Sequence, residues 1–301
     1  MKSLPLLLLA IALTACAGAP PARPANGQPS PVVPSPSTAT RLQADLVPSE
    51  LIVGDNRFAV GLMDPNGQMV HDATVHFQYY DLSNPKTPAL ESEADAVRLE
   101  TPDRLTTIFA NERKFDRAGN WGAVIQARLP DGSAGMASIG FQVLTESPTL
   151  KVGQKMPAVD TPTAAQVNDN LKLLTSSIRP NPAFYRTSLA QAVRSGKPTL
   201  FLLSTPAYCT SRMCGPAYDT TGDLQKLYGD RINFVSVEVY TGLPNPAESN
   251  WQLNPVMQDL GLATEPWLFL VDQNGTVVYR VEGLFTADEV QKHVQTVLAS
   301  K

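Results

Sequence analysis

The sequence predicts two folded domains: an N-terminal all-β sandwich and a C-terminal α/β domain whose central sheet is flanked by helices. Residues 46–144 are short strand-like segments broken by turn signals, without helical periodicity. From about residue 150 onward, apolar runs of strand length alternate with helix-like segments. A stretch rich in Pro, Ala, Ser and Gly precedes both halves, and the roughly 255 residues after it are enough for two domains.

The first 16 residues have the pattern of an export signal. A lysine is followed by an apolar run and then by Leu13-Thr14-Ala15-Cys16. The apolar run is shorter than a membrane-spanning helix needs. The last four residues resemble the lipobox of bacterial lipoproteins, which implies that cleavage leaves Cys16 lipid-modified; an ordinary cleaved signal is the alternative. We therefore expect an exported protein, lipid-anchored on the extracytoplasmic face of a bacterial membrane.

Residues 17–44 are predicted to be a disordered, Pro-rich tether. They carry almost no bulky apolar side chains, so burial cannot offset the entropy that ordering would cost. The whole chain has a net charge of −4 and no basic run. We therefore expect no nucleic-acid partner, and membrane attachment only through the lipid.

Residues 45–146 are predicted to form the β-sandwich. The segments "NRFAVGLMD", "ATVHFQYYDL" and "ASIGFQVL" are typical of strands. Turn sequences occur at residues 65–67 and 130–132. The segment "FDRAGNWGAVIQA" resembles the corner and late strand of bacterial immunoglobulin-like domains, which implies an immunoglobulin-like sandwich. We expect no enzymatic chemistry in this half.

Two histidines in this half, His71 and His76, do not predict a metal site. Their odd spacing would place them on opposite faces of one strand. Neither a cysteine nor an acidic cluster completes a ligand set beside them in the sequence. We expect both at the surface, and we expect neither a metal nor another cofactor.

Residues 147–301 follow an α/β pattern. A helix in "SLAQAVRSG", ending at Gly196, precedes the strand "KPTLFLLST", whose continuous apolar run is typical of burial on both faces. A loop with two cysteines leads to a helix reaching about Tyr228, then to the strand "INFVSVEVY" and a short helix near residues 256–260. A hairpin and an amphipathic C-terminal helix follow; in that helix Thr286 and Glu289 have the capping-box spacing.

This second half resembles the thioredoxin superfamily over nearly its whole length. The apolar strand leads into a cysteine pair at a helix start, "LFLLSTPAYCTSRMCGP", and the strand "INFVSVEV" follows that helix. Glu265-Pro266 stands directly before "WLFLVD". The resemblance implies a thioredoxin-like fold in which Pro266 is cis and faces the cysteines.

The cysteine pair departs from the family's usual spacing. Cys209 and Cys214 are separated by four residues instead of two. On one regular helix, residues five apart have Cα atoms about 8.6 Å apart, whereas a disulfide requires roughly 4.4–6.8 Å. Either residues 209–213 form a loop with Cys214 at the helix start, or the first turn unwinds on oxidation. Pro216 in the first turn favours the loop.

The favoured function is thiol–disulfide oxidoreductase, with Cys209 and Cys214 as the catalytic pair. One thiolate would attack the disulfide of a protein partner, and the other cysteine would resolve the mixed disulfide. A helix N-terminus would favour the thiolate of Cys214. Cys209, at the end of the strand, is an equal candidate for the attacking sulfur.

Four further residues are predicted to contact the partner chain. The resemblance implies that Pro266 shapes the groove, with Tyr208 and Trp267 as aromatic walls; core packing is an equal expectation for Trp267. Arg212 adds positive charge beside the cysteines. Turnover would need a separate membrane or extracytoplasmic redox donor, because the sequence predicts no transmembrane helix that could bring electrons across.

Three other functions are open alternatives. A disulfide closing so short a loop stabilises by roughly 2 kcal/mol and could be a staple in a non-catalytic module that binds a partner. "STPAYCTSRMC" also resembles Q-type peroxiredoxins, in which the first cysteine reacts with peroxide and the second resolves the sulfenic acid. Here Thr205 is out of register with that family, and Glu265-Pro266 replaces its arginine. A copper chaperone of the Sco type would need a histidine near the pair; the histidine of this half, His293, is predicted to face solvent.

Overall fold

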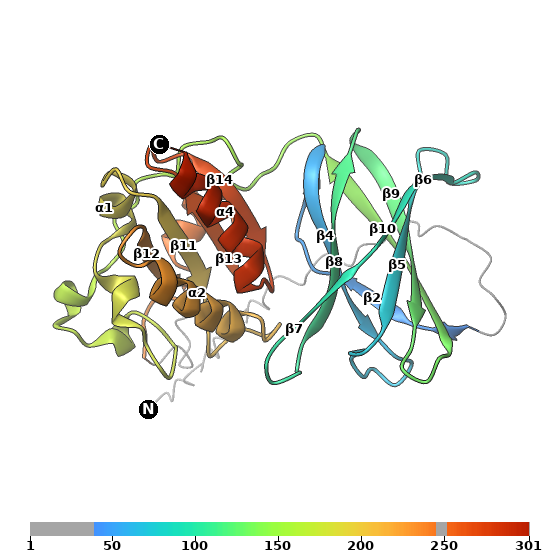
Figure 1. Ribbon diagram of the computed structural model, residues 1–301, viewed down its shortest axis with the longest axis horizontal. Helices are drawn as coiled ribbons and strands as arrows, with labels where there is room; N and C mark the ends of the chain where they lie inside the picture. The colour runs from blue at the N-terminus through green and yellow to red at the C-terminus, as the bar shows by residue number, and fades with distance from the viewer. Residues whose placement is uncertain (1–38, 245–251, 301) are drawn as a thin grey trace, which may run out of the picture.

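The computed structural model describes residues 39–244 and 252–300, which form two domains lying side by side (Figure 1). The predicted signal, with Cys16, and most of the predicted tether lie outside the described residues. In the described part of the chain, no helix combines the length and the apolar character needed to span a bilayer.

The first domain begins earlier than the sequence predicts. Two strands, β1 (Thr40–Arg41) and β2 (Gln43–Leu46), use residues that we placed at the end of the tether. β1 pairs in parallel with part of β10 (Ala134–Leu144). Between the two strands, Leu42 is only 6% exposed and joins the core. A single buried leucine creates no periodic pattern. The boundary between tether and sandwich was therefore predicted from composition alone and was placed too late in the chain.

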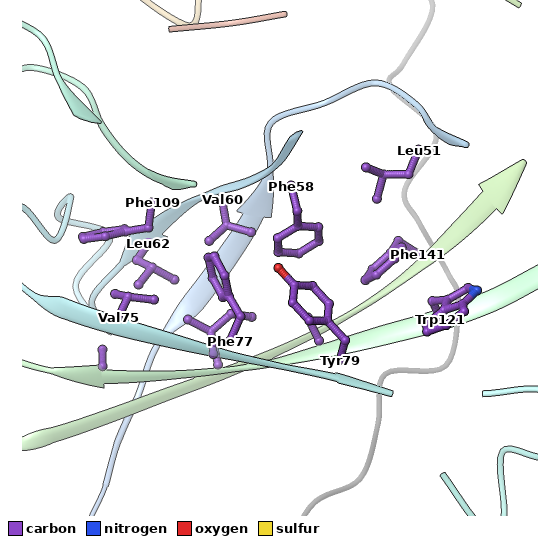
Figure 2. Close-up of a cluster of buried hydrophobic side chains, with 14 of the residues drawn as sticks. Leu51, Phe58, Val60, Leu62, Val75, Phe77, Tyr79, Phe109, Trp121 and Phe141 are labelled. Atoms are coloured by element: carbon purple, nitrogen blue, oxygen red, sulfur yellow. The ribbon is translucent and has the colours of Figure 1, made fainter. Parts of the chain in front are cut away.

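The other strands of the first domain complete two sheets. They are β3 (Leu51–Ile52), β4 (Gly54–Met63), β5 (Thr74–Asp81), β6 (Ala89–Asp95), β7 (Val97–Glu100), β8 (Thr107–Phe115) and β9 (Gly119–Arg128). One sheet has the strand order β2-β4-β8-β7; the other has the order β1-β10-β9-β5-β6, with β3 also paired to β10. Side chains from both sheets fill one apolar core between them (Figure 2).

Aromatic rings occupy the centre of this core. Phe58 of β4 packs edge-on against Phe77 and Tyr79 of β5, with ring centroids 5.2 and 5.1 Å apart. Trp121 of β9 packs in the same way against Phe115, at 5.0 Å. Each large apolar side chain buried here contributes roughly 1.5–3 kcal/mol. The predicted sandwich is therefore present, while its immunoglobulin-like ancestry stays a prediction.

The two histidines are not on one strand, so that part of the sequence analysis is wrong. His76 lies on β5, but His71 precedes it. His71 Nδ1 lies 2.8 Å from the hydroxyl of Thr107. His76 Nδ1 lies 2.7 Å from the carboxylate of Asp95, and this hydrogen bond raises the pKa of His76.

The second domain contains the predicted helices and strands in the predicted order. They are α1 (Leu189–Val193), β11 (Thr199–Ser204), α2 (Cys214–Tyr228), β12 (Asn233–Glu238), α3 (Pro255–Asp259), β13 (Trp267–Val271), β14 (Val277–Glu282) and α4 (Ala287–Ala299). Three short 3-10 helices precede them: η1 (Ala164–Val167), η2 (Leu171–Leu173) and η3 (Pro182–Tyr185). The sequence did not predict these three helices, because a single helical turn produces no periodic pattern.

The sheet of this domain has the order β12-β11-β13-β14. β11 runs parallel to β12 and antiparallel to β13, and every residue of β11 is buried. Side chains of α2 and α4 pack on one face, and side chains of α1 and α3 pack on the other. This double cover explains the continuous apolar run of β11.

The two domains meet through an apolar contact. Leu284, just after β14, is 3% exposed and lies against the outer face of the β4-β8-β7 sheet. Its neighbours there are Ala59, Leu99, Ile108 and Ala110, together with the partly buried Val47 and Met213. The residue before it, Gly283, has a φ of 81°, and an added Cβ would lie 2.8 Å from Val47. The domains are thus joined by a close packing of side chains.

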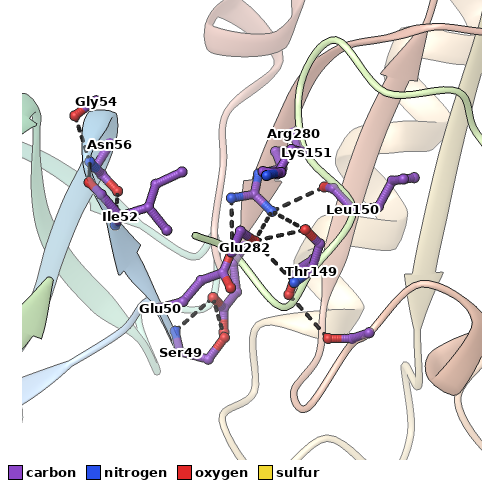
Figure 3. Close-up of polar contacts among 12 residues, drawn as sticks. Ser49, Glu50, Ile52, Gly54, Asn56, Thr149, Leu150, Lys151, Arg280 and Glu282 are labelled. Atoms are coloured by element: carbon purple, nitrogen blue, oxygen red, sulfur yellow. Dashed lines mark hydrogen bonds and ion pairs between the residues drawn. The ribbon is translucent and has the colours of Figure 1, made fainter. Parts of the chain in front are cut away.

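Polar side chains also join the two domains (Figure 3). The carboxylate of Glu282 accepts hydrogen bonds from the N–H and the hydroxyl of Ser49, at 2.7 and 2.9 Å. Arg280 forms a mostly buried ion pair with Glu50, with 2.7 Å between nitrogen and oxygen. Both pairs join β14 to the segment between β2 and β3, so the interface combines apolar and charged contacts.

A third polar contact changes the predicted helix cap. The hydroxyl of Thr286 accepts a hydrogen bond from the N–H of Glu289, as the capping pattern predicts. The Glu289 carboxylate does not return to the backbone of Thr286; it binds Arg57 of β4, at 2.8 Å. A contact between the domains thus replaces half of the capping box.

Candidate redox site

The cysteine loop joins β11 to α2. Cys214 is the first residue of α2, so the two cysteines do not share one helix. Arg212 has a left-handed backbone, with a φ of 60°, and its N–H donates a hydrogen bond to the carbonyl of Cys209 at 3.2 Å. This turn folds Cys209 back towards the start of the helix, as the loop interpretation of the sequence requires.

The sulfur of Cys209 lies at the N-terminus of α2. The N–H of Cys214 donates a hydrogen bond to Cys209 Sγ at 3.4 Å, and the hydroxyl of Ser211 lies 3.1 Å from the same sulfur. Free N–H groups and the helix dipole favour negative charge at this point. The helix start therefore stabilises charge on Cys209, whereas the sequence had suggested this role for Cys214.

The two cysteines differ in burial and in pKa. Cys209 is half-buried, whereas Cys214 is 0% exposed. Hydrogen bonds, chiefly the one from the Cys214 thiol, lower the pKa of Cys209 to about 6. Burial raises the pKa of Cys214 far above its ordinary value, and the hydrogen bond with Cys209 raises it further. At neutral pH the reduced pair thus holds one thiolate and one thiol.

Glu265 is the site residue that the sequence analysis missed. An oxygen of its carboxylate and the two cysteine sulfurs all lie within 4.8 Å of one another. The sheet brings them together because Leu203 of β11 pairs with Trp267 of β13, which places the residues before Trp267 beside the end of β11. Glu265 directly precedes Pro266, and the sequence predicts that this proline faces the cysteines. That position could have identified Glu265 as a site residue.

Pro266 and Trp267 lie at the start of β13. The Glu265–Pro266 peptide bond is cis, and Pro266 is buried. Trp267 is 3% exposed, its ring stacks on that of Phe269, and its Nε1 donates to the hydroxyl of Thr264 at 3.2 Å. Trp267 is therefore a core residue, and the expectation that it forms a groove wall is replaced by core packing.

The other two predicted contact residues lie in the loop itself. Tyr208 is half-buried, and its N–H donates to the carbonyl of Thr205 at 3.2 Å. Arg212 is exposed, and its positive charge contributes to the lowered pKa of Asp103, whose largest cause is a hydrogen bond from Thr101. Arg212 thus also faces the β-sandwich.

The β-sandwich contacts the cysteine loop directly. The hydroxyl of Thr106, next to β8, donates a hydrogen bond to the carbonyl of Ser211 at 3.3 Å. Met213 packs against the apolar cluster around Leu284. With the charge interaction of Arg212, three consecutive loop residues between the cysteines face the first domain. The redox site is therefore built by both domains.

A cavity of about 150 Å³ lies at the carboxyl end of β12. Its lining includes Glu238, Tyr240 and Gly242. Burial raises the pKa of Tyr240, and its electrostatic interactions with Glu265 and the cysteine pair raise it further. Glu238 Oε2 accepts a hydrogen bond from the N–H of Ser176 at 2.7 Å, while burial raises the pKa of Glu238.

His293 is not part of this site. It lies on α4, and its ring stacks on that of Tyr279 with centroids 3.9 Å apart. It is half-buried, so the expectation that it faces solvent is wrong. Within the described residues, the group of possible metal ligands at the pair contains two sulfurs and a carboxylate, without a histidine.

Comparisons with known proteins give weak likenesses. No family model matches the chain, and a search of curated proteins finds no match. A solved structure described as a putative thiol:disulfide interchange protein DsbE from Chlorobium tepidum is 16% identical, with a TM-score of 0.34, covering 50% of this chain and 99% of that one. A copper-bound variant of FetP from uropathogenic Escherichia coli is 12% identical, with a TM-score of 0.24, over 31% of this chain and 75% of that one.

A third likeness is to the sensor domain of the anti-sigma factor RsgI4 of Pseudobacteroides cellulosolvens. It is 9% identical, with a TM-score of 0.22, and the match covers 37% of this chain and all of that one (100%). TM-scores this low support no conclusion about function. The functional assignment therefore rests on the geometry of the site.

Proposed function

We propose that this protein is an exported, membrane-tethered thiol–disulfide oxidoreductase. The observation that carries the proposal is the asymmetry of the cysteine pair: Cys209 is half-buried and has a pKa lowered to about 6, while Cys214 is buried and stays protonated. Exchange requires a thiolate that a partner can reach and a second thiol held back to resolve the intermediate. This pair has both.

In the proposed reaction, the Cys209 thiolate attacks one sulfur of a partner's disulfide. A bond forms between the two sulfurs, and the partner's other sulfur leaves as a thiolate and takes up a proton. Cys214 then loses its proton and attacks Cys209 Sγ, which releases the second partner sulfur. The partner gains two electrons, and the pair becomes a disulfide. A separate membrane or extracytoplasmic dithiol donor would reduce that disulfide again.

The partner chain is proposed to lie against the half-buried side of Cys209. Tyr208 directly precedes Cys209 in the sequence, and Pro266 directly follows Glu265, whose carboxylate lies near both sulfurs. The cavity near Tyr240 offers space for a small partner side chain. Trp267, being part of the core, is left out of this surface.

Attachment to the membrane is proposed to occur through lipid on Cys16. The pattern Leu13-Thr14-Ala15-Cys16 and the Pro-rich residues that follow it support this. In this arrangement the tether holds an immunoglobulin-like domain, and through it the redox site, away from the membrane. Labelling with a radioactive or clickable fatty acid, lost in Cys16→Ala, tests the anchor.

The reduction potential of the Cys209–Cys214 pair tests the function. The protein is equilibrated against glutathione buffers, and the fraction oxidised is read by thiol alkylation. A potential above about −300 mV is expected, because catalytic pairs range from about −270 to about −120 mV. A potential below about −300 mV would mark a structural bridge. The protein would then be a tethered module that binds a partner without turnover.

Trapping distinguishes the roles of the two cysteines. Cys214→Ser should accumulate mixed disulfides through Cys209, because the resolving thiol is gone. Cys209→Ser, the matched variant, should accumulate almost none, because the remaining sulfur is buried and protonated. Equal trapping by both variants would contradict the assignment of Cys209 as the attacking sulfur.

A further inference from the structure

The reduced cysteines and Glu265 form a compact group of metal-binding atoms. Both sulfurs and one carboxylate oxygen lie within 4.8 Å of one another. In a tetrahedral zinc site, with Zn–S near 2.3 Å and Zn–O near 2.1 Å, ligand atoms are about 3.6–3.8 Å apart. Moving these atoms closer by about 1.2 Å at most would therefore place all three around one ion.

The fold allows such a contraction. Cys209 lies in the loop between β11 and α2, and Glu265 lies in the segment before β13. Both residues belong to connecting segments, while Cys214 is fixed in the first turn of α2. Two of the three ligands can thus move towards the third without disturbing a strand or a helix.

The ligand types select the class of ion. Thiolate sulfur favours soft and borderline cations over Mg²⁺ and Ca²⁺, which prefer all-oxygen sites. Two thiolates and a carboxylate carry three negative charges, which suits a divalent ion better than Cu⁺. Three protein ligands also leave a fourth position open for water or another ligand.

We infer that the reduced pair and Glu265 together bind one thiophilic divalent cation, with Zn²⁺ as its natural representative. Binding joins the ion to both sulfurs as thiolates and to the carboxylate, and the thiol proton of Cys214 passes to solvent. Oxidation of the pair removes both sulfur ligands, so metal and disulfide exclude one another. This inference goes beyond the proposed exchange activity and does not depend on it.

Zinc titration of the full-length reduced protein, without oxygen and in competition with a chromogenic chelator, tests the site. One Zn²⁺ per chain is expected, and none for the oxidised protein. Cys209→Ser and Cys214→Ser should each abolish stoichiometric binding. Glu265→Gln should weaken binding by at least about tenfold, since even supporting residues of metal sites cost that much.

The matched control is Asp230→Asn, an exposed carboxylate beyond the opposite end of α2. It should bind Zn²⁺ like the unchanged protein. Co²⁺ as a second probe keeps the experiment decisive if a cysteine variant folds poorly, because its visible spectrum reports tetrahedral coordination in the unchanged protein and in Glu265→Gln. Absence of stoichiometric Zn²⁺, or equal affinity in Glu265→Gln and Asp230→Asn, would overturn the three-ligand site.

Discussion

The hydroxyl of Thr106, in the β-sandwich, donates a hydrogen bond to the carbonyl of Ser211, which lies between the two cysteines. The hydroxyl oxygen of Ser211 in turn lies 3.1 Å from the sulfur of Cys209. Thr106 of the first domain is thus connected to the Cys209 sulfur through one intermediate residue. The first domain thus contacts and positions the cysteine loop.

Removing this hydrogen bond should change both stability and reactivity. Thr106→Val keeps the side-chain shape and is expected to destabilise the protein by about 0.5–1.5 kcal/mol. The loosened loop should weaken the contacts that hold the Cys209 thiolate, so its pKa should rise and alkylation at pH 6.5 should slow. Thr107→Val is the matched control, because its hydroxyl contacts His71 and Glu100 within the sandwich. Equal alkylation rates in the two variants would contradict the positioning role.

Leu284 should couple the unfolding of the two domains. Its side chain is the centre of the apolar contact between them. Leu284→Ala is expected to cost about 2–5 kcal/mol, through lost burial and the cavity left behind. Calorimetry should then resolve two transitions where the unchanged protein has one. The exposed Leu227, replaced by Ala, should leave the trace unchanged; a single transition in Leu284→Ala would argue against coupling through this residue.

The low pKa of Cys209 should depend on Cys214. The first cause of the lowering to about 6 is the hydrogen bond from the Cys214 thiol. Cys214→Ala is therefore expected to raise the midpoint of Cys209 alkylation from about pH 6 towards the ordinary value of 9.0. The measurement is the alkylation rate across a pH range that brackets both values. A midpoint that stays near 6 would show that the helix N-terminus alone sets the pKa.

The same shift predicts how stability depends on pH. The pKa of Cys209 is about 6 in the folded protein, below the ordinary value of 9.0 expected when unfolded. Between these values the unfolded chain binds the extra proton, so the reduced protein should gain stability as pH rises from about 6 to 9. The contribution is complete above about pH 9 and is lost as pH falls to about 6. Cys209→Ser should lack this slope in denaturant titrations.

Removing one partner of the ion pair between Arg280 and Glu50 should strongly destabilise the protein. Both side chains are mostly buried between the domains. Arg280→Met leaves a buried carboxylate without its partner and is expected to cost about 3–5 kcal/mol. Adding Glu50→Gln should recover part of the loss, as chemical denaturation would show. If the losses in free energy of unfolding from the two substitutions were additive, the coupling would be disproved. The control is Lys226→Met, which breaks the exposed ion pair with Asp223 and should cost at most about 1 kcal/mol.

The sequence by itself determined the main strands and helices of the second domain and the position of the loop that carries the cysteines. β11 follows from a continuous apolar run, and α4 follows from its period and from Thr286 at its N-terminus. The disulfide geometry left two alternatives for the start of α2, and Pro216 favoured the observed start at Cys214. These features depend on neighbouring residues, because backbone preferences and side-chain periodicity act over a few positions.

Only the tertiary structure decided which sulfur is charged and what surrounds it. Glu265 reaches the pair through strand pairing, Thr106 reaches Ser211 from another domain, and Trp267 turns into the core. Likewise, the Glu289 carboxylate binds Arg57 of the first domain and does not complete the predicted capping box. Each of these contacts depends on residues that are far apart in the chain. Burial among such residues is also the largest cause of the raised pKa of Cys214, which keeps its thiol protonated beside the Cys209 thiolate.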